Sequence, residues 1–191
     1  LFEREFSVRK PVIEPWLRTE ETAVIWAASG VGKTMLSHSI ALAIAGGGSV
    51  ADWSAPEPRK VIYFDGEMHL QDVKDRMEML LKTKAVQIDD PNVLLDNLIV
   101  IARQDQEIGV PFYDLTEPES QIAVLNRAQS LGAEVVILDN FTTMSDGLDD
   151  ENASVAFKKI QDFFLQMKRA GIATILVHHS TKNGRANRCT L

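Results

Sequence analysis

The chain has one cysteine, Cys189, in 191 residues, so a disulfide bond within it is excluded. No apolar run approaches the roughly 18 residues that a membrane-spanning helix needs. The first five residues include the charged Glu3, Arg4 and Glu5, and we therefore expect no signal peptide. With so little cysteine and no apolar run long enough to span a membrane, we expect a cytoplasmic protein with no membrane partner.

Aromatic residues are few, at 7%, and the net charge is −7. No basic stripe interleaved with aromatic residues is present, and a protein whose whole surface binds duplex phosphates is disfavoured. A local basic patch is still compatible with this balance. The 45% hydrophobic and 25% charged residues are typical of a soluble globular protein, and the length predicts a single domain spanning 1–191.

A glycine-punctuated turn follows the first apolar run of the chain. It ends in Gly-Lys-Thr and precedes a helical pattern, an arrangement typical of the phosphate-binding loop of nucleoside triphosphatases. The usual motif begins with glycine, where this chain has Ala27. The residues expected to cradle the phosphates of ATP are Ala28, Ser29, Gly30, Val31, Gly32, Lys33 and Thr34.

Each residue type in this loop has a physical reason. Gly30 and Gly32 allow positive φ, so that backbone N–H groups can surround an anion at the start of a helix. Lys33 is expected to reach the β- and γ-phosphates, and the Thr34 hydroxyl is expected to bind Mg²⁺.

Apolar runs alternate with helical patterns along the rest of the chain. The predicted strands are Ala23–Ala27, Val61–Phe64, Leu98–Ile101, Glu134–Asp139 and Ile172–Val177. The predicted helices cover 32–45, ended by the glycines at 46–48, then 70–82, a segment opened by a capping box at Thr116, Pro118 and Glu119, and 152–170. The segments 49–59 and 103–116 are predicted to be loops.

Short, continuously apolar strands separated by helices are typical of a parallel sheet covered on both faces. We therefore predict an α/β, three-layer P-loop fold with a mainly parallel five-stranded sheet. Ligands in such folds bind beyond the carboxyl ends of the strands.

Asp139 closes the predicted fourth strand, where P-loop enzymes place the carboxylate that holds Mg²⁺. The next residue is Asn140, which cannot act as a general base. Glu67, just beyond the second strand, is the best candidate to orient the attacking water, and Gly66 would allow a tight bend there. Asp65 is the second candidate, and Glu67 is alternatively an acid that complements the dipole of the following helix.

These stretches together resemble the RecA-type ATPase core and, more narrowly, the RepA-like hexameric helicase ATPases of plasmids and phages. The matching segments are Pro15-Trp16-Leu17, Ala27–Thr34, Val61–Met68, Val136–Asn140 and Leu176–Gly184. The resemblance implies that Glu67 is the catalytic base and that Arg76, nine residues further on, lies near the adenine. An exposed helix arginine is the alternative for Arg76.

Two neighbouring histidines, His178 and His179, end the fifth strand. Side chains of adjacent strand residues point to opposite faces, so they are a poor chelating pair. The resemblance implies that one of them, for which we prefer His179, senses the γ-phosphate. The alternative is a hydrogen-bonded, partly buried histidine.

The segment after Gly171 contains basic residues and no acidic residue. The resemblance implies that Lys182 or Arg185 acts as a finger in a neighbouring subunit's ATP site or contacts DNA; a solvated tail is the alternative. Relatives continue beyond Leu191 into further strands, so we expect a chain truncated at its C-terminus. The acidic loop 140–151 is expected to make a subunit contact or to begin a helix, rather than to bind DNA.

The sequence therefore predicts a Mg²⁺-dependent ATPase that forms a ring, possibly a hexamer, and drives DNA unwinding or translocation, with single-stranded DNA as a candidate partner. A nucleotide-switched regulator that acts on a protein partner is the alternative. A small-molecule kinase is disfavoured, because no arginine-rich lid follows the fourth strand.

Overall fold

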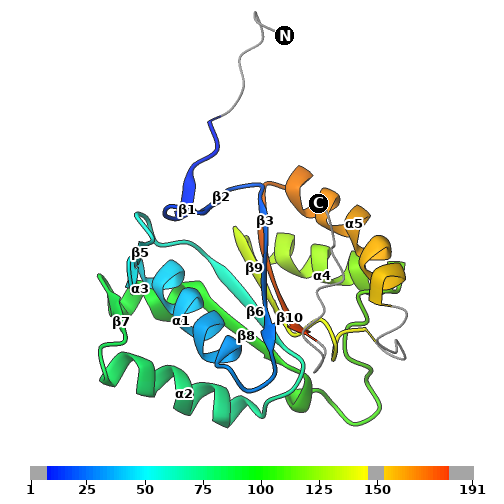
Figure 1. The fold of residues 1–191 in the computed structure, drawn as a ribbon, viewed down its shortest axis with the longest axis horizontal. Coiled ribbons are helices and arrows are strands. Elements are labelled where there is room, and N and C mark those ends of the chain that lie inside the picture. The colour runs from blue at the N-terminus through cyan, green and yellow to red at the C-terminus, as the bar shows by residue number, and fades with distance from the viewer. Residues whose placement is uncertain (1–7, 146–152, 181–191) are drawn as a thin grey trace, which may run out of the picture.

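The structure, a computed structural model, describes residues 8–145 and 153–180. Its centre is a five-stranded sheet, shown in Figure 1. In spatial order the strands are β3 (Thr22–Ala28), β10 (Ala173–Ser180), β9 (Val135–Asp139), β6 (Val61–Asp65) and β8 (Leu98–Ala102). Every neighbouring pair is parallel. The predicted parallel α/β fold is thereby confirmed, and all five strands end at one edge.

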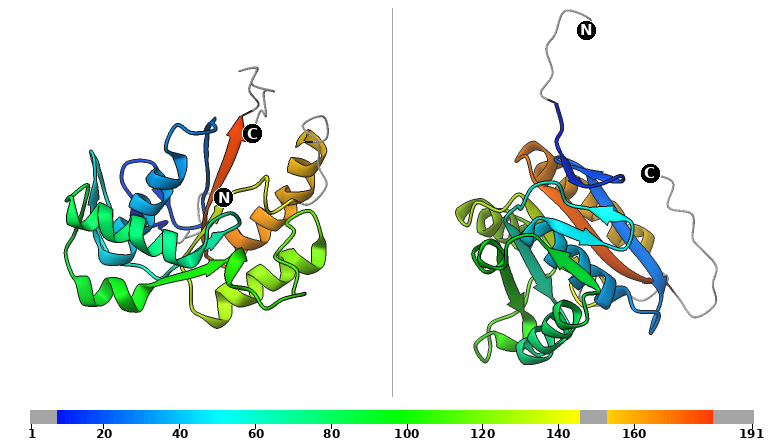
Figure 2. Two further views of the ribbon diagram at one scale, coloured as in Figure 1. Left: turned by 90° about the horizontal axis from the view of Figure 1, so that it is seen from below. Right: turned by 90° about the vertical axis from the view of Figure 1, so that its left-hand side faces the viewer.

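Helices cover both faces of the sheet, as Figures 1 and 2 show. On one face lie α1 (Lys33–Gly46), α2 (Leu70–Lys82) and α3 (Pro91–Asn97), and on the other lie α4 (Pro118–Ser130) and α5 (Ala153–Arg169). Successive side chains of β6 alternate between the two apolar cores. Val61 and Tyr63 belong to the core beneath α1, and Ile62 and Phe64 belong to the core beneath α4 and α5. The central strands are therefore buried on both sides, which explains their uninterrupted apolar sequence.

Two small antiparallel elements were not predicted. A hairpin of β1 (Pro11–Ile13) and β2 (Leu17–Arg18) precedes the sheet. A second sheet has the order β5 (Trp53–Ser54), β4 (Gly48–Val50) and β7 (Val86–Ile88), although 49–59 was predicted to be a loop. Strands of two or three residues are too short to show an alternating pattern.

The two glycines that follow α1 have separate structural reasons. Gly47 is the C-cap of α1 with a φ of 61°, and its N–H donates to the carbonyl of Ala43, so the predicted glycine stop is present. Gly48 already belongs to β4, where an added Cβ would lie 2.1 Å from the carbonyl oxygen of Gln87. The glycine run is thus a close contact between strands as well as a helix end.

The predicted capping box of α4 is wrong. The helix begins at Pro118, and its N-cap is Glu117, which makes no side-chain capping bond. The Thr116 hydroxyl instead donates to Asp114 Oδ1 at 2.7 Å, and the Thr116 N–H donates to the same oxygen at 2.8 Å. Asp114 competes locally for this threonine by forming a turn before the helix. The preceding segment also contains a 3₁₀ turn, η1 (Arg103–Asp105), within the predicted loop.

Candidate active site

The loop between β3 and α1 has the backbone predicted for an anion-binding turn. Gly30 and Gly32 have φ angles of 82° and 94°, in the left-handed region that favours glycine. Gly32 is also the N-cap of α1 and makes no side-chain capping bond. The loop therefore leads directly into a helix N-terminus, where N–H groups and the helix dipole favour negative charge.

Lys33, the first residue of α1, folds back over this loop. Its Nζ donates to the backbone carbonyls of Ala27 at 2.8 Å and Ala28 at 2.6 Å, and the residue is only 6% exposed. Burial lowers the pKa of this ammonium, while the charges of Asp139 and Glu67 act in the opposite direction. Lys33 therefore lies close to the predicted metal ligand Asp139, at the end of β9, and to the predicted base Glu67, in the turn beyond β6.

Asp139 is buried at the end of β9, in contact with hydroxyl groups. Its Oδ2 accepts hydrogen bonds from Ser37 Oγ at 2.9 Å and from the Tyr63 hydroxyl. Burial raises the pKa of Asp139, and hydrogen bonds from the Tyr63, Ser37 and Thr34 hydroxyls oppose this rise. Thr34 and Asp139, the two predicted Mg²⁺ ligands, are thus brought together. Sequence reasoning missed Ser37 and Tyr63, because each looks like an ordinary core position.

Glu67 lies beyond β6 with its side chain 49% exposed, and it is reached by Asn140, directly after β9, and by His179 of β10. Asn140 Nδ2 donates to Glu67 Oε1 at 2.7 Å and lies 2.8 Å from His179 Nε2. The Thr143 N–H donates to Asn140 Oδ1 at 3.2 Å, which orients the amide so that its nitrogen faces the other two side chains. His179 Nε2 is itself 3.6 Å from Glu67 Oε1. Asn140 thereby connects the predicted base to the predicted sensor.

Sequence reasoning considered Asn140 only as a residue that cannot act as a base. It also missed Gln104 in η1, whose amide donates to the carbonyl of Glu67 at 2.6 Å. The available signal was a polar residue just beyond a strand that ends at the site: Asn140 follows β9 directly, and Gln104 is the second residue after β8.

Asp65 points into the protein and organises the turn that carries Glu67. It is 1% exposed, and its Oδ1 accepts the N–H groups of Glu67 at 2.9 Å and Met68 at 2.7 Å. Between the two candidate bases, the geometry favours Glu67, since Asp65 is buried beneath the turn and committed to its backbone. Gly66 permits the turn through close packing and not through a left-handed bend, because an added Cβ would lie 2.1 Å from Thr143 Oγ1.

Two buried titratable side chains face each other below this turn. His38 of α1 is fully buried, and its Nε2 lies 4.0 Å from Asp65 Oδ2. Burial, reinforced by the charge of Arg76, lowers the pKa of His38 to about 4. Burial raises the pKa of Asp65 to about 6, with a smaller contribution in the same direction from Asp139 and Glu67 and an opposing one from its backbone hydrogen bonds.

These two shifts predict opposite effects of pH on folding stability. Between pH 4 and 6.5 the unfolded chain binds a proton at His38 that the folded chain does not, so this group lowers stability as pH falls. Between pH 3.8 and 6 the folded chain keeps a proton on Asp65 that the unfolded chain loses, so this group lowers stability as pH rises. The two contributions oppose each other in the intact protein.

Single substitutions are expected to reveal each slope. Relative to the parent, Asp65→Asn should lose stability as pH falls from 6 to 4, and His38→Phe should lose stability as pH rises over the same range. The change in the free energy of unfolding should approach about 1.4 kcal/mol per pH unit in each variant, which is the slope for a difference of one bound proton between the folded and unfolded states. Urea unfolding at half-unit pH steps measures this, and parallel pH profiles for the two variants would contradict it.

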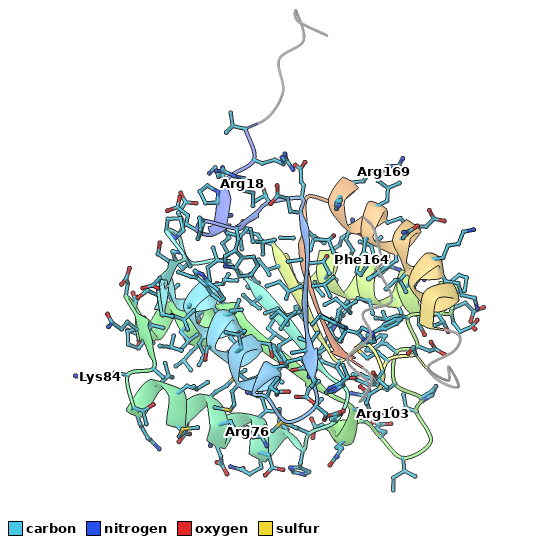
Figure 3. The ribbon with its side chains drawn as sticks, in the orientation of Figure 1. Arg18, Arg76, Lys84, Arg103, Phe164 and Arg169 are labelled. Atoms are coloured by element: carbon cyan, nitrogen blue, oxygen red, sulfur yellow. The ribbon has the colours of Figure 1, made fainter. Side chains whose placement is uncertain are left out.

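The remaining predicted residues are Arg76, His178, Lys182, Arg185 and the acids of 146–151. Arg76 is exposed on α2, and Figure 3 labels it in the lower part of the view, as it does Arg103 beyond β8. His178 packs against Phe141, with ring centroids 5.5 Å apart. Lys182, Arg185 and the acids of the 146–151 segment lie outside the described residues.

Two searches of the described part of the chain gave no candidate. Within 8–145 and 153–180, no group of three His, Cys, Asp or Glu side chains could hold a metal ion. No helix in the same ranges has the length and apolar character to cross a membrane.

Comparison with known proteins identifies the family and the fold. The profile of the AAA domain family matches residues 1–185. A search of curated proteins found no match. Among solved structures, a KaiC-like protein from the hyperthermophilic archaeon Pyrococcus horikoshii OT3 is similar, with a TM-score of 0.62 and 14% identity over 93% of this chain and 70% of that chain.

An identity of 14% shows the fold alone, and as many as 485 matching chains share it. The likeness places the chain among RecA-type folds, and the family match identifies the class of protein. Since that match extends over most of the sequence, the chain belongs to the AAA domain family and is a RecA-type P-loop ATPase.

Proposed function

We propose that this ATPase hydrolyses ATP with Mg²⁺ and that Glu67 orients the attacking water. The observation that carries the proposal is the convergence of three charged side chains from three elements. The negative charges of Asp139 from β9 and Glu67 from beyond β6 both act to raise the pKa of the Lys33 ammonium of α1. A cation for phosphate, a carboxylate for the metal and an exposed carboxylate for water are the parts that phosphoryl transfer needs.

The phosphate loop supplies binding. Residues Ala28–Thr34 present backbone N–H groups at the start of α1, and Lys33 would exchange its two carbonyl partners for phosphate oxygens. The exchange is favourable because an ammonium pairs more strongly with a charged phosphate than with neutral carbonyls.

The donors near Asp139 fit Mg²⁺, which prefers hard oxygen ligands and usually keeps waters and phosphate oxygens. Thr34 would contribute its hydroxyl and Asp139 its carboxylate, with Ser37 and Tyr63 fixing the orientation of Asp139. When bound, the cation would neutralise negative charge on the phosphates. The fit is consistent with the lack of a three-residue protein cluster among the described residues.

Glu67 is proposed to orient water, and His179 to respond to the γ-phosphate. Asn140 supports both roles, since its amide contacts Glu67 and His179 at once. A change at His179 would alter the bond that restrains Glu67. Arg76 is proposed to lie near the adenine, which is supported by its exposure on α2 and by its electrostatic effect on His38 of the adjacent α1.

The biological task proposed is unwinding or translocation of DNA by a cytoplasmic ring of subunits, in the manner of RepA-like plasmid and phage helicases. This part rests on the sequence resemblance, with Lys182 and Arg185 as the finger or the DNA contact. The net charge of −7 favours a second candidate, a nucleotide-switched ATPase that acts on a protein partner.

Hydrolysis rates with DNA distinguish the two candidates. For a DNA motor we expect single-stranded DNA to stimulate phosphate release several-fold and duplex DNA of the same length to have little effect. The control is the Lys33→Met variant, whose rate should not respond to either DNA. A rate that is independent of single-stranded DNA at low and moderate salt would overturn the motor and favour the regulator.

A further inference from the structure

Glu67 depends on Asp65 for its position. The Asp65 Oδ1 atom accepts the backbone N–H groups of Glu67 and Met68, and Gln104 holds the Glu67 carbonyl from the other side. The exposed end of Glu67 is thus the tip of a turn whose base is the buried Asp65 carboxylate. A shift of that carboxylate would displace Glu67.

The second oxygen of Asp65 is unused. Among the described residues, Asp65 Oδ2 has no hydrogen-bond partner although it is buried. A buried carboxylate oxygen without a partner is unfavourable, because it has lost its hydration and received nothing in exchange. The His38 Nε2 atom lies 4.0 Å from this oxygen.

His38 likewise has polar atoms that are buried without a hydrogen-bond partner. Within the described part of the structure, neither ring nitrogen has a hydrogen-bond partner, although the side chain is fully buried. The ring packs against Tyr63 with centroids 5.0 Å apart, and Tyr63 in turn bonds Ser37 and Asp139. The rest of this face of α1 is mostly apolar, so the presence of a buried imidazole at this position calls for a structural explanation.

The position of His38 relative to the phosphate loop suggests an explanation. It lies one helical turn after Thr34 on α1, the helix that starts at the phosphate loop. The separation of 4.0 Å is about 1 Å longer than a hydrogen bond, so a small movement of α1 toward β6 would close it. Such a bond would tie the phosphate-binding helix to the turn that carries Glu67.

We propose that His38 is a positioning residue: its Nε2 pairs with Asp65 Oδ2 when nucleotide is bound and thereby fixes Glu67 against the phosphate loop. The inference rests on the proposed function, since it assumes that Glu67 orients water. His38 does not touch the substrate and acts only through Asp65. In this pair the imidazole Nε2–H donates a hydrogen bond to the carboxylate oxygen, and no covalent step is involved.

The test compares two substitutions of His38 in the full chain. His38→Phe keeps the ring volume and the contact with Tyr63 but removes the nitrogen, whereas His38→Gln places an amide near the position of Nε2. We expect His38→Phe to lower kcat for ATP about tenfold with KM within about twofold, and His38→Gln to retain kcat within about threefold. Ser39→Ala, at similar depth on α1 but bonded only to the Met35 carbonyl, should match the parent.

A double-substitution cycle separates positioning from a general structural role. In a Glu67→Gln background, His38→Phe should lower the residual rate less than twofold, because there is no base left to position. Equal losses in both backgrounds, equal losses in the Phe and Gln variants, or an unchanged kcat would each overturn the inference. If Glu67→Gln itself hydrolyses at the parental rate, the proposed function and this inference both fail, which distinguishes that case from failure of His38 alone.

A measurement on the unsubstituted protein covers the case in which His38→Phe does not fold. Nitrogen-15 NMR of labelled histidines should show the His38 Nε2 signal move toward a hydrogen-bonded value when an unhydrolysable ATP analogue saturates the protein with Mg²⁺. The Lys33→Met variant, which is expected to bind nucleotide at least about tenfold more weakly, provides the control at an analogue concentration that saturates the parent only. An unchanged His38 signal at saturation overturns the proposal.

Discussion

Replacing Glu67 with glutamine is expected to lower the rate of ATP hydrolysis by about 10²- to 10⁴-fold, the range over which general acid–base groups contribute. Glutamine keeps an oxygen that can accept the bond from Asn140 Nδ2, so the arrangement of Asn140 and His179 should persist. Only the carboxylate charge is removed. Nucleotide affinity should therefore stay close to that of the parent. Phosphate release at saturating Mg-ATP and titration with a fluorescent ATP analogue measure the two quantities.

The matched control is Glu78→Gln on α2. It makes the same chemical change at an exposed acid that pairs with Lys74 and Lys82 far along the helix from the site. Exposed pairs of this kind contribute little, and the rate should not change. Parental hydrolysis by Glu67→Gln would remove Glu67 from the mechanism and direct attention to water held by other groups.

Lys33→Met is expected to weaken ATP binding by at least about tenfold and to reduce hydrolysis below detection, because a charge-assisted bond to phosphate is lost. The unliganded protein should keep its thermal midpoint. Burial lowers the pKa of this ammonium, which means that its charged form is partly desolvated in the unliganded loop. Removing the charge should therefore not destabilise the unliganded fold. Calorimetric titration with ATP and thermal unfolding without ATP test the two parts.

Lys74→Met serves as the control, since Lys74 is an exposed lysine of α2 whose nearest acid is Glu78 at 3.8 Å. It should bind and hydrolyse ATP like the parent. A Lys33→Met protein that binds ATP with parental affinity would show that the loop between β3 and α1 does not hold the phosphates.

Several features could be predicted because they are encoded in contiguous residues. The phosphate loop needs only its two glycines and the helix that follows, and both glycines have positive φ. The inner strands β6, β9 and β10 were recognisable because burial on both faces demands a continuous apolar run, as in Val135–Leu138. The predicted capping box at the start of α4 was wrong because Thr116 hydrogen-bonds to Asp114 instead. Sequence propensities do not determine which of these two bonds the threonine makes.

The connections among the site residues could not be predicted in this way. The bond from Ser37 to Asp139 joins residues 102 positions apart, and that from Asn140 to Glu67 joins residues 73 apart. Which of Asp65 and Glu67 faces the site depends on the turn after β6, which is held by hydrogen bonds to Asp65 and allows close packing of Thr143 against Gly66.

The sequence by itself determined the class of fold, the phosphate loop and the strands at whose ends the polar residues stand, because local periodicity and backbone freedom are properties of short segments. Only the tertiary structure decided that Asn140 bridges Glu67 and His179, that hydroxyls hold Asp139, and that His38 faces Asp65. Those contacts require strand order and register, in which β9 lies between β6 and β10. Order and register follow from packing of the whole core, and no single segment encodes them.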